Sequence, residues 1–488
     1  MKLGQTSLVT LWVTLFVVIS SFAYAKESNT VLETVPQSNV ELPISWDVHQ
    51  FVSTSIDNDP TLAEAQYKKS IKSLRIKSIK NSAILPKFKA SILFGPAPDI
   101  NEVVETELVD GKLIETKETR YDFSTFGPYF GTKIEMAQPL NISRLRYGLM
   151  AAQADLDVTA WDYKKVQVVL NYELQKIYYG LSYAMSMNRL ASKALKELTK
   201  VADKLEEALD EEDENVSQFD LLELKSNRYS LDKALYETEE GLARARLGFR
   251  FSLGEQGEHI QILDTLIRQR KDVIPPLEDL KKALYEKHPD LKKLNYGLKA
   301  KRALINLAGG EMGPGFFLFG EFKYAKSWAG DRTNFGEDAF SRDPINTIDG
   351  ALGVGVQYNL NFWAQQDKLK KAKYEYNLLK KKDIYAATGL LLLMEEAYNK
   401  VTLHKKRIKS AQRSLRASDA WLKGAAMKYD IDPSQGGILL KAFKQNMSNR
   451  KDLYDSVYAY NLAVGALFSK VGWTLAEYQS IYNTKTSQ

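Results

Sequence analysis

The sequence contains no cysteine, and this absence excludes several kinds of site at once. A chain without thiols has no disulfide framework, no thiolate metal site, no catalytic cysteine and no N-terminal cysteine for a lipid anchor. The four histidines, at positions 49, 259, 288 and 404, are isolated from one another. Phosphate-binding loops, G-x-S-x-G elbows and H-E-x-x-H motifs are missing. The sequence therefore gives no sign of an enzyme, a cofactor or a bound metal.

Long apolar runs are also missing beyond the N-terminus. Residues 1–25 have the charged start, the short apolar stretch at 8–19 and the A-x-A ending of a secretory signal peptide, so we expect cleavage after Ala25. The richest later run, 389–394, falls far short of the roughly 18 residues that a membrane helix requires. If the mature chain enters a membrane, we expect a closed β-barrel, which points to the bacterial outer membrane.

Neither sign of charge dominates the chain. Without the signal peptide it has 66 basic and 61 acidic residues, and both kinds are spread along the sequence. Binding to nucleic acid requires a concentrated basic face, which such a distribution does not provide. We therefore expect no nucleic-acid partner.

Proline, the strongest helix breaker, is absent from residues 140–274 and 345–432. Within the first interval Leu170, Leu174 and Ile177 recur at helical spacing. These patterns predict very long helices, since a helix of about 60 residues measures on the order of 90 Å. Such helices need a coiled-coil or bundle partner, because helical propensity alone does not stabilise them.

The long helices are expected to form two hairpins, at about 143–250 and 364–468. Apolar and polar residues alternate with period two in four other segments, which predicts strands. The predicted strands span about 85–96, 128–138, 315–327 and 348–361. The stretches 97–127 and 328–347, which join the strands of each pair, are long and polar and contain Gly and Pro. We expect external loops there.

The second half of the sequence repeats the first. Ser217-Gln218 recurs as Ser434-Gln435, displaced by 217 positions. An internal duplication accounts for this, with one repeat at 58–254 and the other at 288–472. The other parts are the N-terminal extension 26–57, the segment 255–287 between the repeats and the C-terminal tail 473–488.

Short motifs recur in order along both repeats. They are Asn58-Asp59-Pro60-Thr61-Leu62 and His288-Pro289-Asp290-Leu291 opening the repeats, Leu85-Pro86 before the first strand, Gln138-Pro139-Leu140 closing the second, and Asp220-Leu221-Leu222 starting the inner helix. In these motifs the sequence resembles the TolC family of outer-membrane efflux proteins, over essentially the whole mature chain. The resemblance implies a mainly α fold with a membrane β-barrel of about 12 strands, four from each of three chains, continued by a long periplasmic α-helical barrel.

The resemblance also implies a function. It predicts a homotrimer in the outer membrane of a Gram-negative bacterium, surrounded by outer-membrane lipid and with a large periplasmic portion. Such a passive duct is contacted by a periplasmic adaptor protein and coupled to an inner-membrane transporter, in a tripartite efflux or type I secretion system. The residues agree on one point: four strands cannot close a barrel, because small barrels need about eight.

The resemblance further places a gate or filter at the periplasmic entrance. Asp220 matches the acidic position after the first hairpin tip, and Tyr429 matches a tyrosine that links neighbouring helices. A ring of Asp220 together with Glu223, three-fold by symmetry, would favour cations. The alternative is that these carboxylates are solvated residues at a helix start, stabilised by the helix dipole.

The hairpin tips are candidates for contact with an adaptor. They consist of Asn215, Val216 and Ser217 in the first hairpin and Asp432, Pro433, Ser434 and Gln435 in the second. Exposed turns on rigid helices often carry function, although such residues are also what ordinary turns require. The nearby acidic run 210–214 lacks the spaced ligands of a calcium loop and is more typical of a solvated cap.

Two other classes of function stay open. A periplasmic coiled-coil adaptor or envelope scaffold without channel activity would also show a long helical hairpin, but neither the duplication nor the four strands. An enzyme acting on envelope polymers would need a cluster of catalytic groups, of which the sequence gives no sign.

Overall fold

The computed structural model describes residues 45–210, 218–254, 261–330, 345–432 and 436–482. The predicted signal peptide and nearly all of the N-terminal extension before Ser45 lie outside these ranges. The elements are β1 (Ser45–Trp46), α2 (Val48–Asn58), α3 (Pro60–Ile84), β2 (Lys87–Val109), β3 (Lys112–Leu140), α4 (Ile142–Asp210), α5 (Gln218–Leu253), β4 (Gln261–Ile262), α6 (Leu277–Lys287), α7 (Pro289–Gly310), β5 (Gly315–Ser327), β6 (Thr347–Gln357), α9 (Phe362–Ile431), α10 (Gly436–Val471) and α11 (Leu475–Tyr482). Within the described ranges no helix is both long and apolar enough to cross a membrane.

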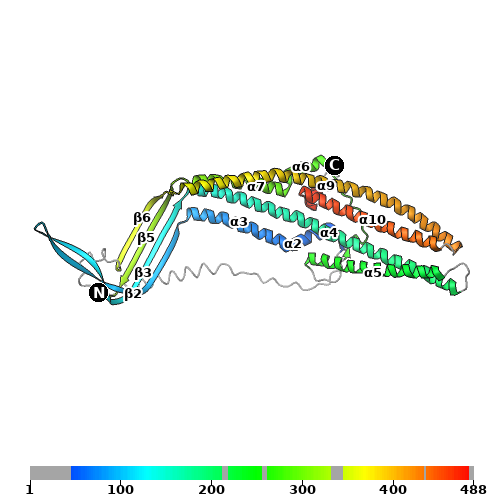
Figure 1. The fold of residues 1–488 in the computed structure, drawn as a ribbon, viewed down its shortest axis with the longest axis horizontal. Helices are drawn as coiled ribbons and strands as arrows, with labels where there is room; N and C mark the ends of the chain where they lie inside the picture. Colours follow the sequence, from blue (N-terminus) through cyan, green and yellow to red (C-terminus); the bar gives the residue numbers. More distant parts are fainter. Residues whose placement is uncertain (1–44, 211–217, 255–260, 331–344, 433–435, 483–488) are drawn as a thin grey trace. The chain divides into compact units, whose positions relative to one another are not determined.

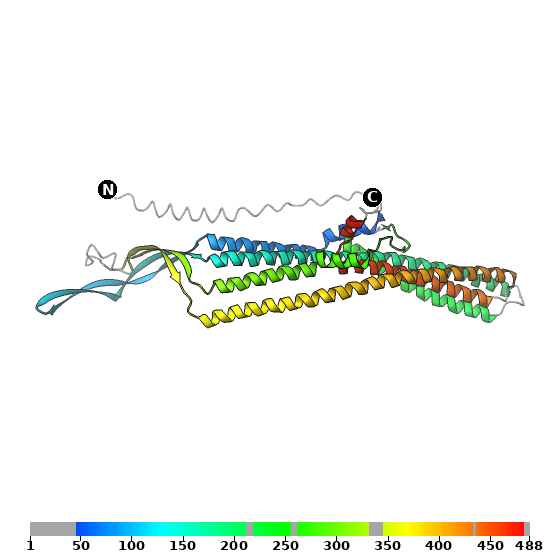
Figure 2. The same ribbon diagram turned by 90° about the horizontal axis from the view of Figure 1, so that it is seen from above.

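Four strands and four helices form one continuous layer. The strands pair antiparallel in the order β2-β3-β5-β6. Helix α3 leads into β2, β3 leads into α4, α7 leads into β5, and β6 leads into α9 (Figure 1). The helices pack side by side in the same order as the strands, α3 on α4, α4 on α7 and α7 on α9 (Figure 2). Within the described ranges the layer therefore has two open edges, one at α3 and β2 and the other at α9 and β6.

The change from helix to strand is encoded locally. Helix α3 ends at Ile84, and Leu85 is already extended with φ −94° and ψ 132°. The next residue is Pro86, which disfavours a helical conformation in the residue before it. Proline at the first position of α3 and of α7 has the opposite role, because its fixed φ suits a helix start.

Beyond the layer, α4 and α9 continue into the two predicted hairpins. Helix α5 packs against α4, and α10 packs against α9. Contacts between α10 and α4 join the two hairpins. The structure thus places a helix pair in each half of the chain, where the proline-free intervals predicted one.

The register gives the sheet two different faces. One face is almost entirely apolar, as the alternation in the sequence predicted. Its apolar side chains include Phe88, Ala90, Ile92, Phe94, Phe130, Ile134, Met136, Phe316, Leu318, Phe322, Leu352, Val354 and Val356. The opposite face carries Lys89, Lys133, Glu135, Glu321, Lys323 and Asp349.

The prediction of an external loop over 97–127 is wrong. Strands β2 and β3 continue through this stretch and pair from Asp99 opposite Asp122 to Val109 opposite Lys112. The reversal is a tight turn at Asp110-Gly111, where both residues have positive φ (51° and 75°), as a two-residue hairpin turn requires. Polarity was a poor guide here, because the hydrogen bonds that pair two strands run between backbone groups and do not require apolar side chains. We call the paired residues 99–122 the ribbon.

The base of the ribbon is tightly packed. The ladder shifts register between Pro98 and Asp99. A Cβ atom on Gly127 would lie 2.4 Å from the backbone nitrogen of Ala329, so only glycine fits there. Gly330 has a φ of +67° and lies against the carboxylate of Asp99. The other predicted loop, 328–347, lies largely outside the described residues.

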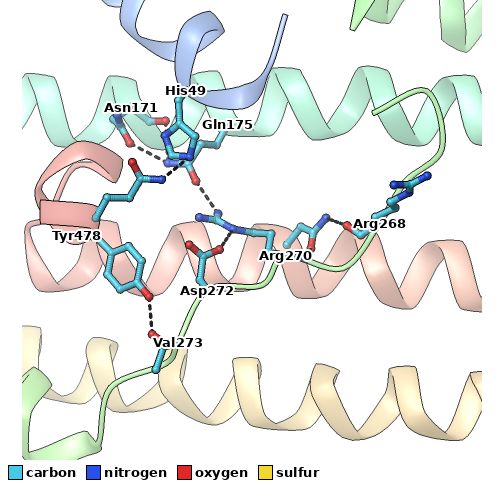
Figure 3. A network of polar contacts seen from close by, with 10 residues as sticks. His49, Asn171, Gln175, Arg268, Arg270, Asp272, Val273 and Tyr478 are labelled. Carbon is cyan, nitrogen blue, oxygen red and sulfur yellow. Dashed lines mark hydrogen bonds and ion pairs between the residues drawn. The ribbon is translucent and has the colours of Figure 1, made fainter. Parts of the chain in front are cut away.

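A buried arginine ties the segment between the repeats to both of them (Figure 3). Arg270 donates hydrogen bonds from Nε to the Asp272 carboxylate at 2.5 Å and from NH1 to Gln175 Oε1 of α4 at 2.7 Å. Its backbone N–H donates to Asn461 Oδ1 of α10 at 3.1 Å. Nearby, His49 Nε2 of α2 lies 2.6 Å from Gln479 Nε2 of α11. Elements from the two ends of the described chain therefore meet at one place.

Candidate functional site at the hairpin ends

An apolar cluster joins the two hairpins near their turns. Its buried members come from three helices, α4, α5 and α10. They are Leu198, Leu205, Leu221, Leu224 and Leu440, packed against the partly buried Val201, Leu209, Leu231, Tyr429 and Phe443. Leucines at these spacings present one face of each helix, so burial of the cluster holds the second hairpin against the first.

A cavity of about 520 Å³ lies beside this cluster. Its apolar wall includes Leu198, Val201, Leu422, Leu439 and Phe443, and its charged lining includes Lys193, Glu197, Glu223, Lys423 and Arg450. Helices from both hairpins therefore contribute to one partly apolar cavity.

Polar contacts accompany the apolar cluster. Glu223 of α5 and Lys444 of α10 form an ion pair between the hairpins, with Oε1 and Nζ 3.7 Å apart. Within the second hairpin, the Asp419 carboxylate of α9 accepts hydrogen bonds from Asn446 at 2.6 Å and from Arg450 at 3.0 Å, both on α10. Asn446 is only 1% exposed, so its amide depends on its acceptors, the Asp419 carboxylate and Ser418 Oγ.

The structure brings two of the three predicted gate residues to this region. Glu223 pairs with Lys444, and Tyr429 packs against the apolar cluster and lines the cavity. Asp220 lies in the first turn of α5, but its side chain is outside the described part of the structure.

The predicted adaptor-contact tips lie mostly outside the described residues. This holds for Asn215, Val216 and Ser217 and for Pro433, Ser434 and Gln435. Asp432 is described: it caps the C-terminal end of α9, and its backbone N–H donates to the Lys428 carbonyl at 2.8 Å.

Sequence reasoning named no basic partner for the predicted gate carboxylates. The structure pairs Glu223 with Lys444 from within α10. Lys444 directly follows Phe443 of the apolar cluster. Charged residues that flank an apolar seam commonly pair across it in coiled coils, and this was the usable signal.

Taken together, the layer of four strands continued by four helices and the two packed hairpins define a known architecture. The chain has a TolC-like fold, mainly helical with one four-stranded antiparallel sheet, as the sequence predicted.

Solved structures of outer-membrane channels share this fold. The channel CmeC of Campylobacter jejuni is 13% identical, with 93% of this chain and 97% of CmeC covered at a TM-score of 0.68. The open state of the channel MtrE of Neisseria gonorrhoeae is 14% identical, covering 91% and 98% at 0.68. CusC, studied for the conformational changes that accompany folding and transmembrane channel formation, is 16% identical, covering 90% and 96% at 0.67. By sequence, neither a family model nor a curated protein matches the chain.

Proposed function

We propose that this chain is a passive exit duct in the outer membrane of a Gram-negative bacterium, that it has a large periplasmic portion, and that it is a homotrimer without enzymatic activity. The observation that carries the proposal is the single layer with two open edges. A layer of this kind completes its hydrogen bonds and buries its edges by pairing with copies of itself.

Apolar stripes on the edge helices support assembly through these edges. On α3, Tyr67, Ile71 and Leu74 follow helical spacing and are 71%, 63% and 62% exposed. On α9, Tyr374 and Tyr385 are 72% and 84% exposed. Exposed apolar stripes on two helices suit a coiled-coil contact between α3 of one copy and α9 of the next.

The sheet supports a membrane location. Its apolar face suits lipid, and its charged face suits water, which is the alternation of a transmembrane barrel wall. Four strands cannot close a barrel, so β2 of one copy would pair with β6 of the next. Three copies would supply twelve strands, more than the about eight that a small closed barrel needs.

We propose further that the duct works with a periplasmic adaptor and an inner-membrane transporter, in efflux or type I secretion. The hairpin tips, from Asn215 to Ser217 and from Asp432 to Gln435, are the proposed adaptor contacts. The chain offers no energy source of its own among its motifs, so the driving force would come from such partners.

The entrance gate is proposed at the hairpin ends. Asp220 and Glu223 would form a three-fold ring that favours cations, and Tyr429 would hold the second hairpin in the closed position. The pair of Glu223 and Lys444 is half exposed, so by itself it contributes little to stability. The apolar cluster would therefore supply most of the closing free energy.

One experiment tests the duct. Purified protein in detergent is examined for oligomeric mass and for conductance in planar bilayers, next to the double variant Ile71→Asp with Leu74→Asp and the control Ser73→Asp on the same helix. Trimers with discrete conductance steps are expected for the native protein and the control, and loss of trimers for the double variant. A soluble, non-conducting monomer would overturn the proposal and favour the coiled-coil scaffold.

A second experiment tests the gate in the same bilayers. Asp220→Asn should reduce the preference for potassium over chloride, and Glu223→Gln should add to the reduction. Tyr429→Ala should raise the fraction of open channels. Unchanged selectivity and opening in all three would assign these residues to helix capping and packing.

A further inference from the structure

Two neighbouring rows of charged residues cross the polar face of the sheet. One row aligns Lys89, Glu135 and Glu321 on β2, β3 and β5, with one more acidic than basic residue. The next row on the same face aligns Lys133, Lys323 and Asp349 on β3, β5 and β6, with one more basic than acidic residue. Rows two residues apart on one face are separated by about 7 Å, which is within reach of long charged side chains.

Lys133 joins the two rows. Its Nζ lies 2.8 Å from Glu135 Oε1 and 3.1 Å from Glu321 Oε1, so one ammonium group forms ion pairs with two carboxylates. Glu135 has a second, longer contact, 3.9 Å from Lys89 Nζ. The carboxylates therefore do not stand as free negative charges on this face.

In the proposed duct, this charged face must point towards the water-filled lumen. A lysine at the middle of a membrane costs about 2–4 kcal/mol on the lipid side of a barrel, whereas the lumen accepts charge freely. The face opposite carries one lysine, Lys326, which lies at the end of β5 and not in its middle. In the proposed trimer, the two rows would repeat around the lumen as adjacent belts of mixed charge, one with a net negative and one with a net positive charge.

We propose that Lys133 sets the ion preference of the barrel by neutralising Glu135 and Glu321, so that anionic and cationic cargo pass the barrel alike. The inference rests on the proposed duct. Any selection of cargo by its charge would then take place at the periplasmic entrance. Wall charges act on passing ions over a Debye length of about 10 Å at 0.1 M salt but only about 3 Å at 1 M. The effect on ion preference is therefore expected at low salt.

The test is the potassium-to-chloride permeability ratio, from reversal potentials at low salt in planar bilayers. Lys133→Gln is expected to raise the ratio at least two-fold, because it removes one positive charge from each chain and takes away the lysine that pairs with Glu321. The double variant Glu135→Gln with Glu321→Gln is expected to lower it by a similar factor. Lys133→Arg should keep the native ratio. Lys112→Gln, at the turn of the ribbon, is the matched control and should also leave it unchanged.

The outcomes separate the two proposals. Both shifts should disappear at 1 M salt, because the wall charges are screened there. A shift caused by a change in pore width would persist. Conducting trimers of Lys133→Gln with an unchanged ratio would overturn the inference while leaving the duct intact. If Lys133→Gln does not assemble, the double carboxylate variant decides alone. A native protein that does not conduct would overturn the duct, and the inference with it.

Discussion

His288 is expected to make the folded chain sensitive to acid. It is the N-cap of α7, and its Nδ1 accepts a hydrogen bond from the backbone N–H of Asp290 at 3.1 Å. The neutral ring therefore carries its proton on Nε2. The residue is 6% exposed. Burial lowers the pKa of His288 to about 4, with Asp290 opposing the shift and Lys165 and Lys470 adding to it.

The lowered pKa fixes the direction of the pH effect. Between pH 6.5 and about 4, the unfolded chain binds a proton at His288 that the folded chain does not bind. The free energy of unfolding is therefore unaffected by His288 protonation above pH 6.5, and it decreases as the pH falls towards about 4. A pKa difference of about 2.5 corresponds to about 3 kcal/mol per chain.

The assay compares the native protein with His288→Asn in detergent. Asparagine is also a good N-cap, but it does not titrate. The free energy of unfolding is measured by denaturant titration at about pH 7 and about pH 4.5, following helix content by circular dichroism. The native protein should lose about 2.5 kcal/mol more than the variant. Other acid-sensitive groups, such as His49, affect both proteins equally. Equal losses would refute the reasoning.

Three further predictions concern stability. Arg270→Met should destabilise the fold by about 1–3 kcal/mol, because it leaves the partly buried Asp272 carboxylate and the buried Gln175 side-chain oxygen without their donor, and denaturant titration at neutral pH would show it. Gly330→Ala should loosen the base of the ribbon, since the new Cβ would overlap the Asp99 carboxylate, and limited proteolysis should then cut the ribbon faster than in the native protein. Asp47→Ala removes the capping box of α2 and should cost about 1 kcal/mol, seen as faster hydrogen exchange in that helix while α7 stays unchanged.

Much of the fold could be predicted because its signals are periodic. Proline-free intervals with apolar residues at helical spacing correspond to α4 and α9, and alternation corresponds to the sheet faces. The ribbon was missed because most of its residues are polar and its apolar residues do not alternate with period two, the pattern on which the strand prediction depends. The Asp110-Gly111 turn was the overlooked signal, since Asp-Gly is a strong hairpin indicator.

The contacts between distant segments could not be predicted from one sequence. The pair of Glu223 and Lys444 depends on how far α5 and α10 are displaced along each other, and no local pattern fixes that displacement. The same holds for Arg270, which reaches Gln175 across 95 positions of the chain. Sequence reasoning named Glu223 as a candidate gate carboxylate but not its partner Lys444.

A wall one element thick has a consequence for the life of the free subunit. Among the described residues of one copy, nothing pairs with the outer edges of β2 and β6, and the apolar stripes of α3 and α9 are exposed. In the proposed homotrimer, the stability of each subunit would then depend, by mass action, on the concentration of the others. A subunit that is exported as proposed but not yet assembled would also be a template for faulty strand pairing. The interval between export and assembly would therefore be the time of greatest aggregation risk, when escort by a periplasmic chaperone would matter most.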